Sequence, residues 1–310
     1  MNRADTLQRR GLYPVPPGSS ESLGLEAVGI VISHGTGGNT TTFPAVGSRV
    51  MCLLGGGGNA EYVAVNPRHC FPVPPGMTMR EASAIPETWL TAFQLLYIEG
   101  ALGGREKGLS GSTVVVHGAG SGVGTAAIQL AVKAGARVVA VAGSDRKLAY
   151  CKSLGAAVGV NYKEDTEGFP ARLKTAVGSV GASLILDPVG ASFAAANIEA
   201  LGMDGVWVLY GSMGGLKLGG SPAGDLLLPV LLKKRARLVG TTLRNRDDEY
   251  KAALVTRFRE EALPLFSTEP PIYKPVIHGE FPLEGTGAAH MEMEGNGTIG
   301  KIILKVSGEL

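Results

Sequence analysis

From residue 113 to residue 263, two hydrophobic patterns alternate along the chain. Short continuous runs of Val, Ile, Leu and Ala suit strands buried on both faces, whereas apolar residues recurring every three or four positions suit helices. The first pattern predicts strands at 113–117, 137–142, 158–161, 183–187, 205–210 and 236–241. The second predicts helices at 122–134, 145–154, 168–177, 191–201, 222–233 and 247–263. This alternation predicts an α/β domain with a doubly wound parallel sheet.

The two ends of the chain show a different pattern. Prolines interrupt residues 1–20, which are predicted to form a loop. Short strands are predicted at 25–33, 47–54 and 60–65, with a polar glycine turn at 34–40. Helical patterns follow at 78–83, 87–98 and 286–294, and a last strand is predicted at 301–306. We therefore expect a β-rich lobe formed by 1–93 and 263–310, with the parallel-sheet domain, 94–262, inserted into it.

A glycine-dense turn with the sequence GAGSGVG, residues 118–124, joins the first strand and the first helix of the inserted domain. A helix N-terminus favours pyrophosphate because unpaired N–H groups and the positive dipole end converge there. The spacing departs from strict G-x-G-x-x-G, since Ala119 and Ser121 take the first two glycine positions when Gly124 is the third. The strand–turn–helix–strand context favours a dinucleotide site, with a merely structural turn as the alternative. The residues predicted to bind it here are Ala119, Ser121, Gly122, Val123 and Gly124.

Composition narrows the class of protein. The chain has 310 residues, of which 46 are Gly and 18% are charged, and its formal net charge is +2. A net charge this small gives no electrostatic reason to expect nucleic acid or a membrane surface as partner. Residues 113–132 carry no charge, but their glycines argue against a membrane span. The three cysteines, Cys52, Cys70 and Cys151, are far apart, and the N-terminus has no apolar signal segment. A reducing, cytoplasmic location is therefore expected.

Several further motifs occur along the chain: LGLEAVG at 23–29, GSRV at 47–50, AIPETWLTAFQLL at 84–96, SGVGTAAIQ at 121–129, AGS at 142–144 followed by Lys147, LGA at 154–156 and NYK at 161–163. Together they resemble the medium-chain dehydrogenases/reductases, and in particular their zinc-free quinone oxidoreductase branch, over essentially the whole chain. The resemblance implies a Rossmann domain inserted into a GroES-like β-rich lobe. It also implies transfer of hydride from NADPH to a small quinone.

The resemblance also bears on the N-terminus. In that family the equivalent of residues 2–5 lies well inside the outer lobe, after its first strands, whereas almost nothing precedes those residues here. It therefore implies an N-terminally truncated lobe that lacks its first strands and that either folds poorly or leaves the active cleft open.

No metal site is predicted. Zinc-dependent relatives place a histidine beside a glutamate in a Gly-His-Glu motif, but this chain has Gly24, Leu25 and Glu26 there, and leucine cannot ligate a metal. The adjacent pair His69 and Cys70 has no second pair to complete a zinc site. Glu26 is therefore expected to be a structural carboxylate.

The end of the second strand of the sheet distinguishes NAD from NADP. An acid there bonds the ribose of NAD, and the spacing of Asp145 after the glycine turn would permit that role. Ser144 lies nearer the strand end, however, and Lys147 follows about one helical turn later, so both can reach one phosphate. The resemblance implies that Ser144, Lys147 and Tyr162 bind this phosphate, and NADPH is the predicted cofactor.

Other site residues come from the resemblance and from strand ends. Tyr13 resembles a tyrosine that lines the quinone pocket, Ser121 is expected between the phosphates and the active cleft, and these two are the predicted catalytic residues. Hydride transfer to a quinone needs mainly proximity and orientation, so no obligate general base is expected. His117, at the end of the first strand, is interpreted as structural. The remaining predicted cofactor-binding residues are Thr91, Gly190, Gly211, Ser212, Arg246 and Asn296.

The leading hypothesis is an NADPH-dependent, zinc-free quinone oxidoreductase. Two alternatives stay open: an NADPH-dependent enoyl or enone reductase on the same scaffold, and an NADPH-binding protein that has lost catalysis with its N-terminal strands. The late strands are apolar, and the last strand of an open sheet leaves an unpaired edge. The resemblance implies pairing at that edge into a homodimer. The expected partners are thus a small quinone and a second copy, with no metal, nucleic acid or membrane.

Overall fold

The computed structural model describes residues 1–35, 44–100 and 108–306, so residues 36–40 of the predicted polar turn lie outside the described residues. The chain folds into two compact units. The first unit comprises Met1–Thr91 and Leu243–Leu310, and the second comprises Ala92–Thr242. The second unit is therefore inserted between the two segments of the first.

The second unit is built on a six-stranded sheet whose neighbouring strands are all parallel. Its strands are β4 (Thr113–His117), β5 (Arg137–Ala142), β6 (Val158–Asn161), β7 (Ala182–Asp187), β8 (Leu201–Leu209) and β9 (Arg237–Gly240). Their spatial order is β6-β5-β4-β7-β8-β9, so the order reverses between β4 and β7. This arrangement confirms the predicted doubly wound Rossmann sheet. The carboxyl edge at such a reversal is where these sheets bind ligands.

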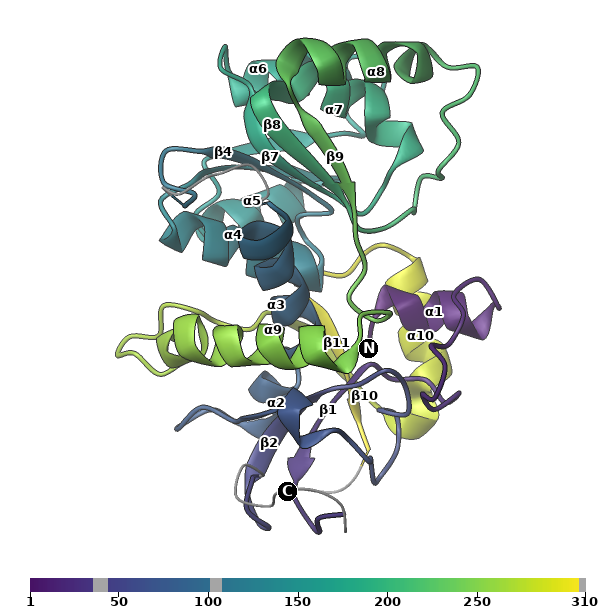
Figure 1. Cartoon of the computed structure of the whole chain (residues 1–310), viewed down its shortest axis with the longest axis vertical. Helices are drawn as coiled ribbons and strands as arrows, with labels where there is room; N and C mark the ends of the chain where they lie inside the picture. The colour runs from purple at the N-terminus through teal and green to yellow at the C-terminus, as the bar shows by residue number, and fades with distance from the viewer. Residues whose placement is uncertain (36–43, 101–107, 307–310) are drawn as a thin grey trace. The chain divides into compact units, whose positions relative to one another are not determined.

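Helices cover both faces of this sheet. Figure 1 shows α4 and α5 on one side of it, with α6, α7 and α8 on the other. The bounds are α4 (Gly122–Lys133), α5 (Asp145–Ser153), α6 (Phe169–Val177), α7 (Ala194–Ala200), preceded by the 3₁₀ turn η4 (Ala191–Phe193), and α8 (Pro222–Lys234). All six strands and these helices lie where the hydrophobic pattern predicts them, to within a few residues. Among the helices in the described ranges, none combines the length and apolar character that a membrane-spanning helix needs.

The first unit holds two small sheets. Strands β1 (Glu26–Ile30), β2 (Arg49–Leu53) and β3 (Cys70–Pro72) form an antiparallel sheet in that order, and β10 (Ile277–Pro282) pairs in parallel with β11 (Lys301–Lys305). The helices and turns are α1 (Arg3–Arg9), η2 (Pro67–His69), α2 (Met79–Ala82), α9 (Asp248–Glu261), η5 (Leu263–Phe266), η6 (Leu283–Gly285) and α10 (Thr286–Glu294). Helix α3 (Pro86–Gln94) runs from the first unit into the second and ends in a π-helical turn, η3 (Leu95–Glu99).

Two segments of the first unit differ from the prediction. Residues 3–9 form a helix rather than a loop, because the Asp5 carboxylate accepts a hydrogen bond of 2.7 Å from the Asn2 backbone N–H and caps the helix start. Residues 60–65 form no strand, although their side chains alternate. Val63 and Val65 pack against the cluster of Val50, Cys52, Leu54 and Cys70. That packing explains the alternation without pairing of the backbone in a sheet.

The structure also places α9 in the first unit, whereas the prediction extended the inserted domain to residue 262. Helix α9 belongs there because Phe258 packs edge-to-face on Phe71 of β3, with ring centroids 5.8 Å apart. Polar contacts agree: the Asp248 carboxylate accepts a hydrogen bond of 3.1 Å from the Asn66 amide. A helical period identifies a helix, but it does not identify the surface that the helix buries.

A buried carboxylate organises the carboxyl ends of β7 and β8. Asp187 is fully buried, and its Oδ1 accepts hydrogen bonds from the backbone N–H groups of Val189 at 2.7 Å and Gly190 at 3.1 Å. Its Oδ2 accepts from the Asn197 amide and the Trp207 indole, each at 2.9 Å. One carboxylate therefore satisfies four donors, and it anchors the loop that follows β7.

His117 extends this network from the end of β4. Because the Asn197 amide nitrogen donates to Asp187, its oxygen faces the imidazole, and His117 Nε2 donates to it at 2.6 Å. Burial lowers the pKa of His117 although the Asp187 charge opposes that shift, so the ring is neutral at pH 7. The ring also packs against Phe193, with centroids 5.0 Å apart. This arrangement agrees with the structural role expected for His117.

We expect Asp187→Ala to lower the free energy of unfolding by at least about 3 kcal/mol, because four buried donors lose a charged acceptor. Urea unfolding followed by circular dichroism measures this change. The matched control is Asp204→Asn, which weakens the exposed pair of Asp204 and Arg235 and should cost less than about 1 kcal/mol. Equal effects of the two substitutions would contradict the role assigned to Asp187.

Candidate functional site

The glycine turn between β4 and α4 brings backbone very close to backbone. A Cβ on Gly124 would lie 2.5 Å from the Gly118 carbonyl oxygen and 2.6 Å from that of Ala119, so only glycine fits the start of α4. Gly118 has φ +59°, which also favours glycine. The Ser121 hydroxyl caps α4 by accepting a hydrogen bond of 3.0 Å from the Gly124 N–H. The N-terminus of α4 therefore stands at the carboxyl edge of the sheet, where it can receive a phosphate.

The departure from strict glycine spacing has a structural reason. The Ala119 methyl group is fully buried, and its backbone N–H donates to the Val141 carbonyl of β5 at 3.0 Å. A small side chain is therefore accommodated in the core at this position. Ser121 has extended backbone, with φ −74° and ψ 170°, and uses its side chain as the helix cap.

The end of β5 carries the residues predicted to select the phosphate-bearing cofactor. Ser144 caps α5, and its hydroxyl accepts from the Lys147 N–H at 3.5 Å. The aliphatic part of Lys147 lies over the glycine turn, since a Cβ on Gly120 would come within 3.1 Å of Lys147 Cδ. The structure thus brings Lys147 from α5 to the turn that precedes α4, a contact that the sequence did not predict.

Tyr162, which follows β6, lies against the end of β5. A Cβ on Gly143 would fall 2.9 Å from the Tyr162 hydroxyl oxygen, so the phenol ring rests on the Gly143 backbone next to Ser144. The competing acid, Asp145, accepts a hydrogen bond of 3.0 Å from the Asn161 amide. Its carboxylate is engaged at β6, while Ser144, Lys147 and Tyr162 gather around the end of β5.

The loops after β7 and β8 hold each other at the same carboxyl edge. The Ala191 N–H donates to the Gly215 carbonyl at 2.8 Å, and the Gly214 N–H donates to the Val189 carbonyl at 2.7 Å. The loops can come this close only because positions 190 and 211 are glycine. A Cβ on Gly190 would lie 2.5 Å from the Gly215 carbonyl oxygen, and a Cβ on Gly211 would lie 2.7 Å from that of Pro188. Gly190, Gly211 and Ser212 thus form paired loops beside the reversal point of the sheet.

The other predicted site residues lie in the first unit. The Arg244 guanidinium lies over the Tyr13 ring, with its Cζ 5.3 Å from the ring centroid. Burial raises the pKa of the Tyr13 hydroxyl. The Arg246 guanidinium lies over the Tyr250 ring, with its Cζ 4.3 Å from the ring centroid. Asn296 accepts a hydrogen bond of 2.7 Å from Arg3. Thr91 is half-buried in α3, and for these residues a role toward the cofactor stays a prediction.

The first unit also contains a buried polar cluster that sequence patterns missed. The Glu26 carboxylate binds the Lys301 ammonium and accepts 2.7 Å and 2.9 Å hydrogen bonds from the Asn2 amide and the Glu87 N–H. Burial alone would raise the pKa of Glu26, but Lys301 lowers it overall. These side chains come from opposite ends of the sequence, so no local motif could have indicated the cluster.

Two further charged residues of this unit, Glu87 and Arg244, have unusual surroundings. Burial, and then repulsion from Glu26, raises the pKa of Glu87 to about 8, so its carboxyl group is protonated at pH 7 and can donate a proton. Arg244 donates to the Gly55 carbonyl at 2.9 Å and to the Gln8 side chain at 2.7 Å. Its third nitrogen, Nη1, is buried and has no hydrogen-bond partner among the described residues.

A zinc site does not fit these residues. Glu26 is already bound by Lys301, and the neighbouring position is Leu25, which has no ligating atom. Across the part of the chain that the structure describes, no group of three His, Cys, Asp or Glu side chains could hold a metal ion. A catalytic metal therefore has no ligand set within the described residues.

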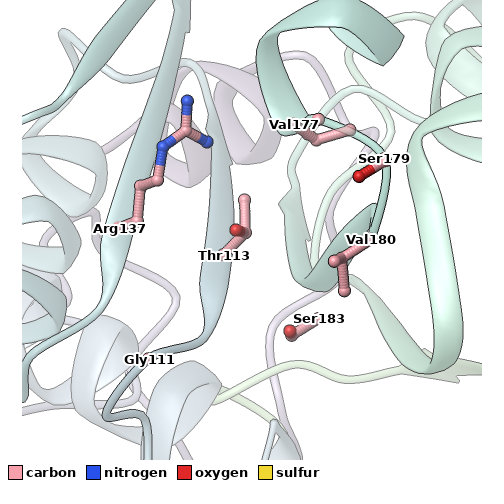
Figure 2. Close-up of a pocket in the computed structure, with 8 residues that line it drawn as sticks. Gly111, Thr113, Arg137, Val177, Ser179, Val180 and Ser183 are labelled. Atoms are coloured by element: carbon pink, nitrogen blue, oxygen red, sulfur yellow. The ribbon is translucent and has the colours of Figure 1, made fainter.

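A hollow of about 330 Å³ lies elsewhere, at the amino-terminal edge of the Rossmann sheet. Figure 2 shows Thr113, Arg137 and Ser183, from the starts of β4, β5 and β7, facing it. Parallel sheets of this type bind nucleotides at the opposite, carboxyl edge. This hollow is therefore not the predicted cofactor site.

Comparisons with known proteins agree with this geometry. Residues 122–258 match the family model of zinc-binding dehydrogenases, and residues 1–75 match that of the alcohol dehydrogenase GroES-like domain. A quinone oxidoreductase of Rattus norvegicus is 27% identical and aligns over 98% of this chain and 85% of its own length.

Two solved structures are also similar. A mycobacterial protein in complex with NADPH has a TM-score of 0.79 at 26% identity, covering 99% of this chain and 88% of the other. An NAD-dependent alcohol dehydrogenase has a TM-score of 0.78 at 27% identity, covering 99% and 89%. The two family matches, the relative aligned over nearly the whole chain and the Rossmann sheet with its glycine turn all agree. This chain therefore belongs to the medium-chain dehydrogenase/reductase superfamily, and it is an NAD(P)-dependent oxidoreductase of that type.

Proposed function

We propose that the protein is an NADPH-dependent, zinc-free quinone oxidoreductase. The observation that carries the choice of cofactor is the position of Lys147 over Gly120, next to Ser144 and Tyr162, because a cation and two hydroxyl groups suit a 2′-phosphate. The choice of substrate is supported by the similarity to the rat quinone oxidoreductase, and the zinc-free assignment by Leu25, which has no ligating atom, beside Glu26. Within the quinone oxidoreductase branch, the motifs resemble in most detail the tumour-suppressor-inducible enzyme of animals.

The residues of the second unit would hold the cofactor as follows. The N–H groups at the start of α4 receive the pyrophosphate, with Gly122, Val123 and Gly124 forming the surface that it approaches. Ser144, Lys147 and Tyr162 bind the 2′-phosphate, and Gly190, Gly211 and Ser212 line the paired loops. Ser121 keeps its hydroxyl proton available for donation, because its oxygen acts as acceptor in the helix cap.

The first unit would supply the remaining groups. We assign Thr91, Arg246 and Asn296 to the cofactor and the Tyr13 hydroxyl to a substrate carbonyl. The bound nicotinamide supplies the hydride, and the protein's task is to orient the reacting atoms. The reduced oxygen takes up its proton from water or from a nearby donor. We further propose a cytoplasmic location, which suits the three free cysteines.

We expect the purified protein to oxidise NADPH with a small quinone faster than with an α,β-unsaturated ketone or an enoyl thioester. NADPH absorbance with each acceptor in parallel measures the two rates. Faster turnover of the enone or enoyl acceptor would assign the protein to the reductase alternative instead. NADPH binding by calorimetry without turnover of either acceptor would indicate a binding protein that has lost catalysis.

Lys147→Ala should raise the KM for NADPH about 10- to 100-fold, because it removes one charge-assisted hydrogen bond to a phosphate. The KM for NADH should change less than about twofold, since NADH lacks that phosphate. Steady-state kinetics with both cofactors gives the comparison. Lys152→Ala, in the last turn of the same helix, is the matched control and should leave both values unchanged. Equal KM values for NADPH and NADH in the unmodified protein would contradict the assignment.

We also propose that the protein is a homodimer formed along β9. This strand is an edge of the sheet, and Leu238 on it is partly exposed. On the adjoining helix α8, Leu228 and Leu232 are one turn apart and 73% and 83% exposed. An unpaired edge beside an apolar helix face suits pairing with a second copy.

Leu232→Asp should shift the protein from dimer to monomer, because it places a charge in the proposed apolar interface. Light scattering at micromolar concentration measures the mass. Met291→Asp is the matched control, since Met291 is 67% exposed and lies on α10 of the first unit, outside the proposed interface, and it should leave the dimer intact. A monomeric mass for the unmodified protein would rule out the dimer.

A further inference from the structure

Two of the three cysteines face each other across the antiparallel sheet of the first unit. Cys52 on β2 and Cys70 on β3 are directly opposite in the strand register. Their Sγ atoms are 3.6 Å apart, and both thiols are free. Cys151 belongs to α5 of the second unit and is fully buried there. The chain therefore contains one close pair of thiols and one isolated thiol.

The backbone around the pair already suits a disulfide. Directly opposed residues of antiparallel strands have Cα atoms about 4.5–5.5 Å apart, and their side chains lie on the same face. Disulfides in proteins span Cα separations of about 4.4–6.8 Å. A bond between Cys52 and Cys70 therefore needs rotation of the two side chains and no rearrangement of the strands.

The two thiols of the pair are chemically unequal. A hydrogen bond joins the two thiols, and it lowers the pKa of Cys70 although burial opposes the shift. The same bond, together with burial, raises the pKa of Cys52. Cys70 is also the more accessible of the two, at 7% exposure against 3%. Cys70 is thus the better nucleophile, with Cys52 placed to react second.

The isolated thiol has the opposite properties. Burial raises the pKa of Cys151 to about 11, and no part of it is exposed. A thiol in such surroundings is inert toward oxidants.

A metal is a poorer explanation for the pair. His69 is adjacent in sequence, but its Nε2 lies 3.2 Å from the Asp248 carbonyl oxygen and is engaged there. No third ligand completes a site among the described residues. Two thiols without further ligands fit a redox pair better than a zinc site.

We propose that Cys52 and Cys70 form a reversible dithiol–disulfide site that is oxidised by a small peroxide. The Cys70 thiolate attacks one oxygen of hydrogen peroxide, the O–O bond breaks, and the leaving hydroxide takes up a proton to become water. Cys70 is then a sulfenic acid. The Cys52 sulfur attacks the Cys70 sulfur, the S–O bond breaks, and a second water leaves with the Cys52 proton. Two thiols and one peroxide thus give one disulfide and two waters, and a thiol reductant reverses the change.

The bond would stabilise a defined part of the first unit. It joins β2 to the edge strand β3 and closes the chain between residues 52 and 70. That segment ends in η2, whose Arg68 pairs with Glu249 of α9 at 2.8 Å. Oxidation would therefore stabilise the contact surface of η2 and β3 with α9 against unfolding.

The test treats the full-length protein, under native conditions, with a modest excess of hydrogen peroxide. We expect free thiols, counted after denaturation under acid quench, to fall from three to one, and the intact mass to fall by about 2 Da. Peptide mapping should identify the Cys52–Cys70 disulfide, and dithiothreitol should restore all three thiols. Cys151→Ala, as matched control, should still lose two thiols.

The order of reaction is tested separately. In Cys52→Ala, a sulfenic-acid probe such as dimedone should label Cys70, whereas Cys70→Ala should give at least tenfold less label at Cys52. Circular dichroism verifies that each variant is folded. Intact-mass analysis of the unmodified protein tests for the disulfide without relying on any substitution. Any of three results would overturn the proposal. They are a disulfide that involves Cys151, a disulfide that joins two chains, and three remaining free thiols under conditions that do oxidise the urea-unfolded protein.

Discussion

The close approach of the α4 N-terminus to the end of β4 is the constraint on which the second unit depends. It exists because position 124 carries no side chain, so the first turn of α4 rests directly on the carbonyl oxygens of Gly118 and Ala119. The unpaired N–H groups of α4 are thereby placed at the carboxyl edge of the sheet. The paired loops after β7 and β8 lie along the same edge, held by the Asp187 carboxylate.

A second set of close contacts lies at the same edge. Lys147 can lie over Gly120, and Tyr162 can lie on Gly143, because neither glycine has a Cβ. Ser144 begins α5 between them. Five residues therefore combine into one surface at the carboxyl edge of the sheet: Gly120, Gly143, Ser144, Lys147 and Tyr162.

The first unit contains a buried ion pair in addition to its two small sheets. Lys301 is buried with Glu26 and Asn2, and the Glu26 carboxylate also receives the Glu87 backbone N–H. Burial, and then repulsion from Glu26, raises the pKa of Glu87 and keeps it protonated at neutral pH. The unit is thus stabilised by the same cluster that gives Glu87 its capacity to donate a proton.

The sequence by itself determined the Rossmann sheet, because each strand and helix there carries its own hydrophobic period and each turn its own glycines. It also determined the glycine turn, which lies within one βαβ unit, whereas Lys147, on α5 of the next unit, reaches that turn only in the folded protein. Tertiary structure decided the helix at residues 3–9, the unpaired segment at 60–65 and the place of α9 in the first unit. It alone brought Glu26, Glu87 and Lys301 together and set Cys52 opposite Cys70. Contacts between residues far apart in the chain leave no local pattern, because burial and strand register arise only when the chain has folded.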